Sequence, residues 1–486
     1  MKLKRFGKVA KTVGSLCLLF SVMFIPPIIV SIIYHDGAMQ QFVESLFITF
    51  FLGVILWLPF KSLDVELYRR DGFLIIVLVW LALGIISSIP FDLILHTSVI
   101  DSLFEAVSGV TTTGATVLSN LDDMPPSLLF YRQELQWFGG MGLIVLAVAV
   151  IPQLGIGGMS IYKAEVPGVM KEEKLTPRLN QTASILWKIY LGLTIACAFF
   201  YWLAGMNAFE AISHSLATVS TGGFSTHDDG FNFFKNSHMF EQIAIVFMLL
   251  GAINFSLHYV ALKEKSLKSY WQDEEVRLFL LIIAFSSALI ILTLSIFHTY
   301  SGLYETSLNA VFTVVSMITS TGFVTTNYSY WPLFIPFFLI LIGFVGGCGG
   351  STAGGMKVMR ILILFKLVGR EMKRLLHPNG VFHIRLNGRK KLADRTLQSV
   401  FGFFALYVAS FVVLLLLMMF DGIDQVTAFS AVATCMNNMG PGLGEVTQSF
   451  ATLDDAAKMI SVASMLLGRL EVVSVLVLLS PDYWRL

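Results

Sequence analysis

Residues 109–116, with the sequence GVTTTGAT, place three consecutive threonines and a glycine between strongly apolar stretches. A surface turn explains the glycine and a helix cap explains one threonine, but neither explains three in succession. Segments of the same kind recur three times in the chain, at residues 218–225 (TVSTGGFS), 318–325 (ITSTGFVT) and 436–443 (MNNMGPGL). The recurrence indicates that the polar segment belongs to a repeated structural unit.

The glycines that the four segments share are spaced by 108, 100 and 118 residues when we align Gly114, Gly222, Gly322 and Gly440. A period of about 110 residues, met four times, is an internal repeat. The apolar stretch after each segment also carries a glycine in a matching place, namely Gly139, Gly251, Gly346 and Gly468. We therefore predict four equivalent units in one chain.

The composition is that of a membrane protein. Of the 486 residues, 56% are hydrophobic and 13% charged, with a mean hydropathy of +0.75. Soluble domains are about 45–50% apolar and about 25% charged. The apolar runs approach the ~20 residues that cross a bilayer, and they lack the alternation of barrel strands. We predict an all-α polytopic membrane protein with ten spans, near residues 13–34, 40–60, 72–90, 128–151, 182–204, 239–262, 277–299, 331–365, 397–420 and 456–480.

The distribution of basic residues predicts the orientation. Of the 33 Lys and Arg residues, 28 fall in one set of loops, whereas the opposite loops carry Arg132, Lys235 and Lys458. Positive loops stay in the cytoplasm, so both termini are expected there. The run at 13–34 follows five basic residues, and a cleaved signal peptide is the alternative. It is too long for one and no small-residue cleavage site follows, which favours a retained first span.

The repeated polar segment suggests an ion-binding role. Non-helical backbone survives at membrane depth only inside protein or along a wet cavity. Four copies around one axis would offer rings of carbonyl and hydroxyl oxygens that replace the water shell of a small cation. Glycine lets the chain turn its carbonyls inward, and the short helix before each segment would aim its negative end at the centre. The alternative, four polar loops at the membrane surface, does not explain the common register.

As a set, the four segments resemble the superfamily of K⁺ transporters that includes TrkH, KtrB and plant HKT proteins. That family repeats span, pore helix and span four times around one pore. The resemblance covers the chain from the third span onward, and the two extra N-terminal spans point to the TrkH branch of the bacterial inner membrane. It implies units at residues 1–70 (extra helices), 71–165, 166–270, 271–385 and 386–486.

The resemblance implies K⁺ uptake through a channel-like pore. Its ion-binding residues would be Thr111, Thr112, Thr113, Gly114, Val219, Ser220, Thr221, Gly222, Thr319, Ser320, Thr321, Gly322, Asn437, Asn438, Met439 and Gly440. In HKT relatives a serine in place of the first glycine accompanies Na⁺ permeation, so Gly114 favours K⁺. The fourth segment departs most, because asparagines and a methionine replace small hydroxyl or valine residues.

The stretch at residues 343–357 (GFVGGCGGSTAGGMK) contains seven glycines. Each costs a helix interior about 1 kcal/mol relative to alanine, so we expect the span at 331–365 to break there. A close-packed helix contact is the alternative. The resemblance implies an intramembrane gating loop below the filter, with the residues Gly346, Gly347, Gly349, Gly350, Ser351, Thr352, Gly354 and Gly355.

Arg469 is a charge inside the last predicted span, where it is expensive and usually faces a pore or a partner. Glu471 lies two residues away and is not on the same helix face. Carboxylates from other helices could hold Arg469. Alternatively, it lies at the cavity wall opposite the Gly-rich loop, where at about 8 Å and an effective dielectric near 20 it repels K⁺ by roughly 2 kcal/mol. The resemblance implies this second role.

Three further acids precede the shared glycines at unequal distances: Glu105, Glu210 and Glu305. They are out of register, so we interpret them as ordinary outer-surface acids, with attraction of cations as the alternative. The four cysteines lie far apart without a CxxC pair and suggest neither disulfides nor metal. No cofactor other than the transported K⁺ is expected.

Partners and rival functions complete the sequence interpretation. Residues 357–395 are basic and suit anionic lipid head groups or an acidic cytosolic ring. The resemblance implies a separate TrkA-like nucleotide-binding regulatory protein and a homodimer with one pore per subunit. Net charge +1 leaves no nucleic-acid footprint. The rivals are a K⁺ or Na⁺ transporter with alternating access coupled to H⁺ or Na⁺, which usually shows two inverted halves, and a membrane enzyme, for which no motif is visible.

Overall fold

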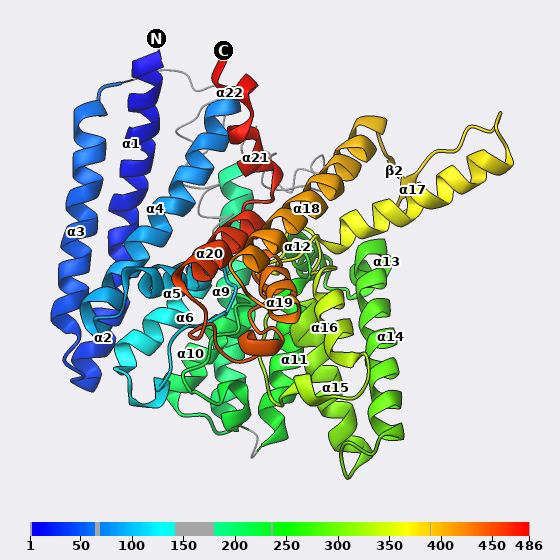
Figure 1. Ribbon diagram of the computed structural model, residues 1–486, viewed down its shortest axis with the longest axis horizontal. Helices are drawn as coiled ribbons and strands as arrows, with labels where there is room; N and C mark the ends of the chain where they lie inside the picture. Colours follow the sequence, from blue (N-terminus) through cyan, green and yellow to red (C-terminus); the bar gives the residue numbers. More distant parts are fainter. Residues whose placement is uncertain (1, 64–68, 141–178, 235–236, 389, 486) are drawn as a thin grey trace.

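The computed structural model describes residues 2–63, 69–140, 179–234, 237–388 and 390–485. Apart from a small hairpin of β1 (Arg385–Leu386) and β2 (Lys390–Lys391), the regular structure of these residues is helical (Figure 1). Three helices precede the repeats: α1 (Lys2–Phe20), α2 (Ile25–Tyr34) and α3 (Met39–Trp57). They pack on one flank, against α4 and α6 of the first repeat.

Each repeat begins with a first span and a short pore helix. The first spans are α4 (Arg69–Leu95), α9 (Leu179–Leu203), α14 (Glu274–Ile296) and α18 (Asp394–Phe420). The pore helices are α5 (Val99–Val110), α10 (Ala208–Val219), α15 (Leu303–Ile318) and α19 (Gln425–Met436). At 12 to 16 residues the pore helices are too short to cross a bilayer, which takes about 20.

The second spans follow the pore helices and are more varied. They consist of α6 (Pro126–Gly140), α11 (His238–Ala252) with α12 (Phe255–Glu264), α16 (Ile335–Gly343) with α17 (Val358–Leu376), and α20 (Asp455–Arg469) with α21 (Val473–Leu479). Two short helices complete the described chain, α13 (Lys268–Gln272) and α22 (Pro481–Arg485).

Side-chain caps fix where three pore helices begin. Ser98 Oγ accepts a hydrogen bond from the amide of Asp101 at 3.0 Å, and Asn207 Oδ1 accepts one from Glu210 at 2.8 Å. Asp424 Oδ2 caps α19 in the same way, accepting from Val426. Each cap satisfies an amide that the first turn leaves unpaired. The caps mark the N-terminal ends of these helices, and their C-terminal ends lie directly before the polar segments.

The repeats close into a ring in chain order. The second span of each repeat packs against the pore helix of the next, in the pairs α6 with α10, α11 with α15, α16 with α19, and α20 with α5. The last pair joins the fourth repeat back to the first. The predicted four-fold arrangement of span, pore helix and span is therefore confirmed.

Among the described residues, six of the ten predicted spans contain a helical stretch long and apolar enough to cross a membrane. The third repeat breaks at the Gly-rich stretch, as predicted, since α16 ends at Gly343 and α17 begins at Val358. The helices of the predicted spans 239–262 and 456–480 are broken, because the helix pairs there bend by 99° and 112°. Asn254 causes the first break by capping α12 through a 2.8 Å bond from the amide of Ser256. The predicted span 128–151 runs beyond the described residues.

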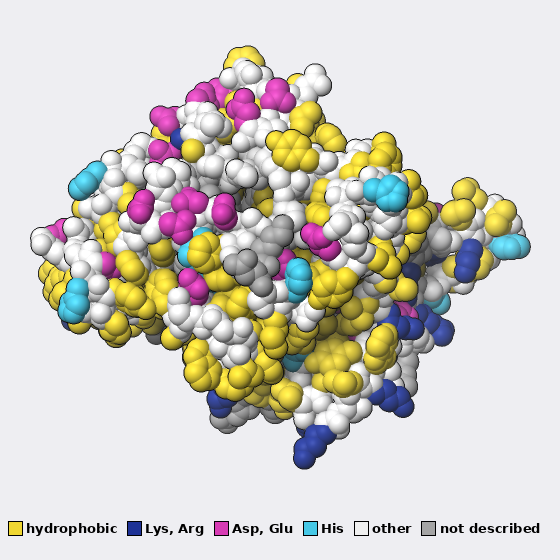
Figure 2. All heavy atoms as spheres, turned by 90° about the horizontal axis from the view of Figure 1, so that it is seen from below, with side chains coloured by type: hydrophobic (Ala, Val, Ile, Leu, Met, Phe, Trp, Pro, Cys, Tyr) yellow, Lys and Arg dark blue, Asp and Glu magenta, His cyan; other side chains and the backbone are white. Residues whose placement is uncertain are grey.

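Both termini lie at the same end of the molecule (Figure 1). The opposite end shows many Asp and Glu side chains, with Lys and Arg near its edge (Figure 2). A basic arm made of α17 and the β1–β2 hairpin extends from the flank of the third and fourth repeats. The polar segments after the pore helices lie between these two ends.

Candidate ion pathway

The four polar segments share one backbone conformation. Each pore helix ends four residues before a glycine in the left-handed region, with φ values of 79°, 79°, 77° and 88° at Gly114, Gly223, Gly322 and Gly440. Two residues earlier, φ is again positive, between 52° and 57°, at Thr112, Thr221, Ser320 and Asn438. Left-handed conformations at alternate residues turn successive peptide groups to the same side, unlike an extended strand.

This conformation corrects the predicted register of the second segment by one residue. The equivalent glycine is Gly223, not Gly222, and the segment is 220–223. Val219 is the last residue of α10, so it belongs to the pore helix. The sequence offered two adjacent glycines, and the length of the helix before them decided which one takes the left-handed position.

The four glycines touch the neighbouring segments around the ring. A Cβ on Gly114 would lie 2.2 Å from the oxygen of Gly222, and one on Gly223 would lie 1.8 Å from that of Thr321. The same holds for Gly322 against Met439, at 2.0 Å, and for Gly440 against Thr113, at 2.8 Å. No side chain fits at these distances. The four segments therefore converge on one centre, each against the next, and the last against the first.

Many carbonyl oxygens of these segments are not used by the protein. In the described part of the chain, no hydrogen bond ends on the carbonyl oxygens of Thr112, Thr221, Ser320, Asn438 or the four left-handed glycines. Buried backbone carbonyls are almost always paired. Threonine hydroxyls, by contrast, bond within the segments, with 2.7 Å between Thr111 Oγ1 and Thr113 Oγ1. The free oxygens are thus mainly backbone oxygens.

The fourth segment keeps this geometry despite its different side chains. Asn437 accepts a 2.7 Å bond from the Tyr407 hydroxyl and donates one to Ala433. Asn438 donates to Thr113 Oγ1 at 3.0 Å and to the carbonyl of Met465 at 3.1 Å. The amides replace the hydroxyl pairs behind the segment, and the carbonyl oxygens of Asn438 and Gly440 accept no hydrogen bond within the described chain. The departure in sequence therefore does not break the four-fold arrangement of the backbone.

A buried ion pair supports the first two segments from behind. Glu105 on α5 is fully buried and meets Arg132 of α6 at 2.7 Å. Arg132 also donates to the carbonyl of Ser225 at 2.9 Å, and its guanidinium lies 4.2 Å from the ring centre of Phe224. The interpretation of Glu105 as an outer-surface acid and of Arg132 as a loop residue is wrong. The sequence did contain one indication of this pair, since Arg132 is an arginine inside the apolar run 128–151.

Glu210 and Glu305 differ from Glu105. Glu210 lies near the outer end of α10 and contacts His227 at 3.0 Å, while Glu305 in the first turn of α15 is partly exposed. The predicted surface position fits these two acids. Gln136 is a further supporting residue that the sequence analysis missed: its amide donates to the carbonyl of Gly222 at 2.6 Å and accepts from Phe224.

The Gly-rich loop between α16 and α17 lies directly against three of the polar segments. Thr352 donates to the last carbonyl of α10, that of Val219, at 3.1 Å, and meets the hydroxyl of Thr221 at 3.2 Å. The amide of Gly354 donates to Ser320 Oγ in the third repeat. The amide of Gly355 donates to the carbonyl of Asn437 in the fourth repeat, at 3.2 Å.

The loop is also held from below and from the side. The amides of Cys348 and Thr352 bond to the end of α11, at the carbonyls of Ala252 and Gly251. Glu275 of α14 accepts from the amides of Gly349 and Met359, at 2.7 and 3.0 Å. Gly346, Gly350 and Gly355 adopt positive φ values of 71°, 77° and 74°. Non-glycine residues are strained in that region, which explains the glycine content of this loop.

Gly346 does not match the glycines of the other second spans. Gly139 and Gly468 lie so close to their own pore helices that a Cβ would be 1.9 Å from the oxygen of Val110 and 2.2 Å from that of Met436. Gly251 approaches Val219 at 2.8 Å. Gly346 instead packs on Gly354 and Gly355 inside the loop. The predicted equivalence of Gly346 is therefore wrong, and the loop replaces that contact in the third repeat.

Arg469 completes the contacts below the filter. Its Nη1 donates to Thr112 Oγ1 at 3.2 Å and to the carbonyl of Thr352 at 3.1 Å, and its Nη2 donates to Gly139 at 2.6 Å. The loop and Arg469 together contact all four segments. Both line a small cavity of about 90 Å³, together with Asn438, Glu471, Lys357 and Trp80. Arg469 is thus bonded directly to the loop beside this cavity. Its gating role stays a prediction.

Comparison with known proteins agrees with this architecture. The family model described as TrkH, cation transport protein, matches residues 38–486. The chain belongs to the TrkH family. A Trk system potassium uptake protein TrkH from Vibrio parahaemolyticus is 48% identical over 485 residues, covering 99% of this chain and 100% of the relative. TrkH from Escherichia coli K12 is 46% identical over 482 residues, covering 99% of both chains.

A solved TrkH structure has the same fold. The crystal structure of the potassium transporter TrkH from Vibrio parahaemolyticus superimposes with a TM-score of 0.89 at 46% identity, covering 99% of this chain and 100% of the other. The TrkH family is one of cation transporters, not of enzymes. This chain is accordingly a multi-span membrane protein of a bacterial transporter family.

Proposed function

We propose that this protein takes up K⁺ across the bacterial inner membrane through a channel-like pore. The observation that carries the proposal is the ring of four segments in which eight buried carbonyl oxygens, those of the four left-handed glycines and of the residues two positions before them, have no donor in the described protein. Such rings replace the water shell of a dehydrated cation. The potassium uptake function printed for the TrkH relatives supports K⁺ as the substrate.

The pore helices favour a cation at the same centre. All four end within four residues of the shared left-handed glycines, so their C-terminal partial negative charges lie next to the segments. Selectivity for K⁺ over Na⁺ would come from the number and spacing of the carbonyl oxygens. Gly114 at the first position supports K⁺, because a side chain there would collide with the second segment.

Gating in this proposal is performed by the Gly-rich loop and Arg469. The loop bonds directly to Val219, Ser320 and Asn437, so an ion leaving the filter on that side meets it first. Arg469 adds a positive charge at the same level. Opening then requires that the loop leave its partners, and its glycines make such a change of backbone conformation accessible.

Orientation and partners follow from the charge distribution. We place both termini in the cytoplasm, because the basic arm lies on their side of the polar segments. The arm continues from the gating loop through α17, so a partner bound there can act on the loop. The partner would be a TrkA-like nucleotide-binding ring. The exposed apolar stripe of α17 supports a homodimer contact through Phe365, Val368, Met372, Leu375 and Leu376.

The gating role is tested by Rb⁺ uptake into proteoliposomes. We expect higher uptake for Arg469→Ala and for a deletion of residues 346–355, with Thr447→Val in an outer loop as a control. Unchanged uptake in both variants would refute a gating role.

The rival is an alternating-access K⁺ or Na⁺ transporter coupled to H⁺ or Na⁺. Single-channel currents with a reversal potential set by K⁺ in mixed K⁺/Na⁺ support the pore, whereas saturating flux that follows a proton or Na⁺ gradient supports the rival.

A further inference from the structure

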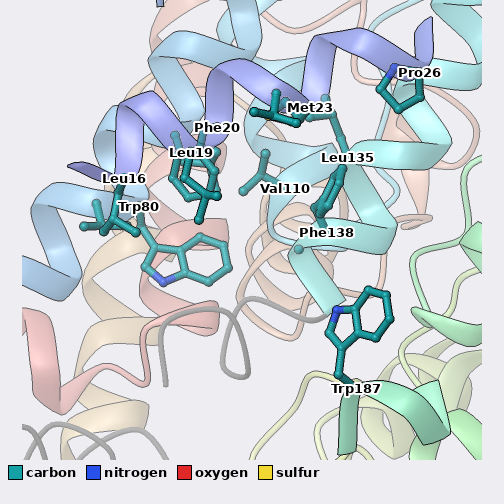
Figure 3. A pocket seen from close by; sticks show the side chains of 14 residues that line it. Leu16, Leu19, Phe20, Met23, Pro26, Trp80, Val110, Leu135, Phe138 and Trp187 are labelled. Carbon is teal, nitrogen blue, oxygen red and sulfur yellow. The ribbon is translucent and has the colours of Figure 1, made fainter. Parts of the chain in front are cut away.

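A second cavity lies behind the first filter segment, on the side of the N-terminal helices. It has a volume of about 300 Å³, within the range of small-ligand pockets. Figure 3 shows apolar side chains facing this space. They come from α1, α4, α5 and α6, from the short turn between α1 and α2, and from α2 and α9, and include Leu16, Phe20, Met23, Pro26, Trp80, Val110, Leu135, Phe138 and Trp187. The lining offers almost nothing to which water could hydrogen-bond.

The cavity is continuous with the lipid-facing surface of the protein. Its inner wall is buried, with Val110, Val79 and Leu135 at most 3% exposed. Its rim carries Leu19 and Val22, which are 48% and 55% exposed on the first apolar span. That span is long enough to cross the bilayer. Within the hydrocarbon core, the groups that surround such a rim are lipid acyl chains.

We propose that this cavity is a binding site for one acyl chain of a membrane phospholipid. An apolar cavity stays free of water, and a void leaves its lining without dispersion contacts. An acyl chain entering beside Leu19 and Val22 regains those contacts and needs no hydrogen-bonding partner. The rim at Leu19 and Val22 gives it a path from the bilayer that crosses only apolar residues.

The side chain of Trp80 would separate the bound acyl chain from Arg469 of the proposed gate. Trp80 lines both the apolar cavity and the polar cavity below the filter. The guanidinium of Arg469 lies 5.7 Å from the centre of its ring. Gly139, which accepts a hydrogen bond from Arg469, lines the apolar cavity too. The site thus links lipid to Arg469, although binding of the chain does not depend on the proposed function.

Brominated lipids test the site directly, because bromine quenches tryptophan fluorescence at contact. The purified full chain is reconstituted in phosphatidylcholine vesicles with or without dibrominated acyl chains. The eight tryptophans are separated by single Trp→Phe variants. We expect the Trp80 signal to be quenched to the same fraction as that of Trp202, which is 58% exposed on α9. Trp331 is the matched control, since it is 5% exposed like Trp80 but lies outside the cavity.

Filling the cavity supplies the second arm. Val79→Phe and Leu83→Phe should each abolish the quenching of Trp80 and leave that of Trp202 unchanged, while Val412→Phe on the lipid-facing side of α18 should alter neither. Two filling variants are used so that one misfolded protein does not decide the result. The proposal would be overturned if Trp80 in the parent chain were quenched no more than Trp331. It would also be overturned if free brominated fatty acid quenched Trp80 but brominated phospholipid did not.

Discussion

Arg469 Nη1 donates a hydrogen bond of 3.1 Å to the carbonyl oxygen of Thr352, which joins the end of α20 to the Gly-rich loop of the third repeat. The same guanidinium reaches Gly139 of the first repeat. Thr352 in turn donates to the second repeat at Val219. Two side chains thereby connect elements of all four repeats, and their bonds contribute to how firmly the loop is held.

The first prediction concerns Thr352→Val. The change keeps the shape of the side chain but removes the one hydroxyl proton that the carbonyls of Val219 and Gly251 share. A net loss of about 1 kcal/mol for this hydrogen bond shifts the equilibrium of the loop toward the open form by about fivefold. Rb⁺ uptake into proteoliposomes should rise by a similar factor. Uptake equal to that of the parent chain would mean that these bonds do not hold the gate closed.

The second prediction tests the corrected register of the second segment. A Cβ on Gly223 would meet the backbone oxygen of Thr321 at 1.8 Å, and its φ of +79° disfavours a side chain. The atoms nearest to a Cβ on Gly222 belong to the side chain of Gln136 rather than to backbone, and Gly222 is not among the glycines with positive φ. Gly223→Ala should therefore abolish K⁺-selective uptake, and Gly222→Ala should reduce it less. Equal losses, or the reverse order, would contradict the assignment of Gly223.

The third prediction concerns the buried pair of Glu105 and Arg132. Removing one partner leaves an uncompensated buried group, which costs about 3–5 kcal/mol. Glu105→Gln and Arg132→Met should each lower the midpoint of thermal unfolding in detergent, measured by intrinsic fluorescence. The double change Glu105→Gln with Arg132→Met should lower it by less than the two single effects combined. Additive losses would show that the pair does not act as a unit.

The fourth prediction is a pH dependence at the outer surface. His227 lies between Asp122 Oδ1, at 2.5 Å, and Glu210 Oε1, at 3.0 Å, and so links the outer segments of the first two repeats. Burial alone lowers the pKa of His227, but the hydrogen bonds and negative charges of Glu210 and Asp122 outweigh it and raise this pKa above 6.5. The folded state therefore favours the protonated ring.

The sign of the effect follows from the raised pKa. The stabilisation is fully present below the unfolded pKa of about 6.5 and is lost as the pH rises through the higher folded value. The thermal midpoint should be higher at about pH 6 than at a pH above the folded pKa, and His227→Gln should remove most of the difference. His298→Gln serves as the control, since that residue has no carboxylate partner within the described chain. A dependence retained in His227→Gln would exclude this site as its origin.

The repeat, the pore helices and the break in the second span of the third repeat could all be predicted from the sequence. They are local properties: hydropathy marks the spans, and glycine excess marks the break at residues 343–357. The register of Gly223 could not be predicted, because two glycines stood side by side and the length of α10 decided between them. The burial of Glu105 was missed because its partner Arg132 lies 27 residues away.

The sequence by itself determined that four similar units cross a membrane, since the periodic pattern of apolar and polar residues fixes what each unit buries. Only the tertiary structure decided that the units close into a ring, through contacts such as Gly440 against Thr113, and that Arg469 meets the carbonyl of Thr352. These contacts join residues more than 100 positions apart. A repeat pattern states which residues are equivalent, whereas the packing of whole helices determines which of them touch.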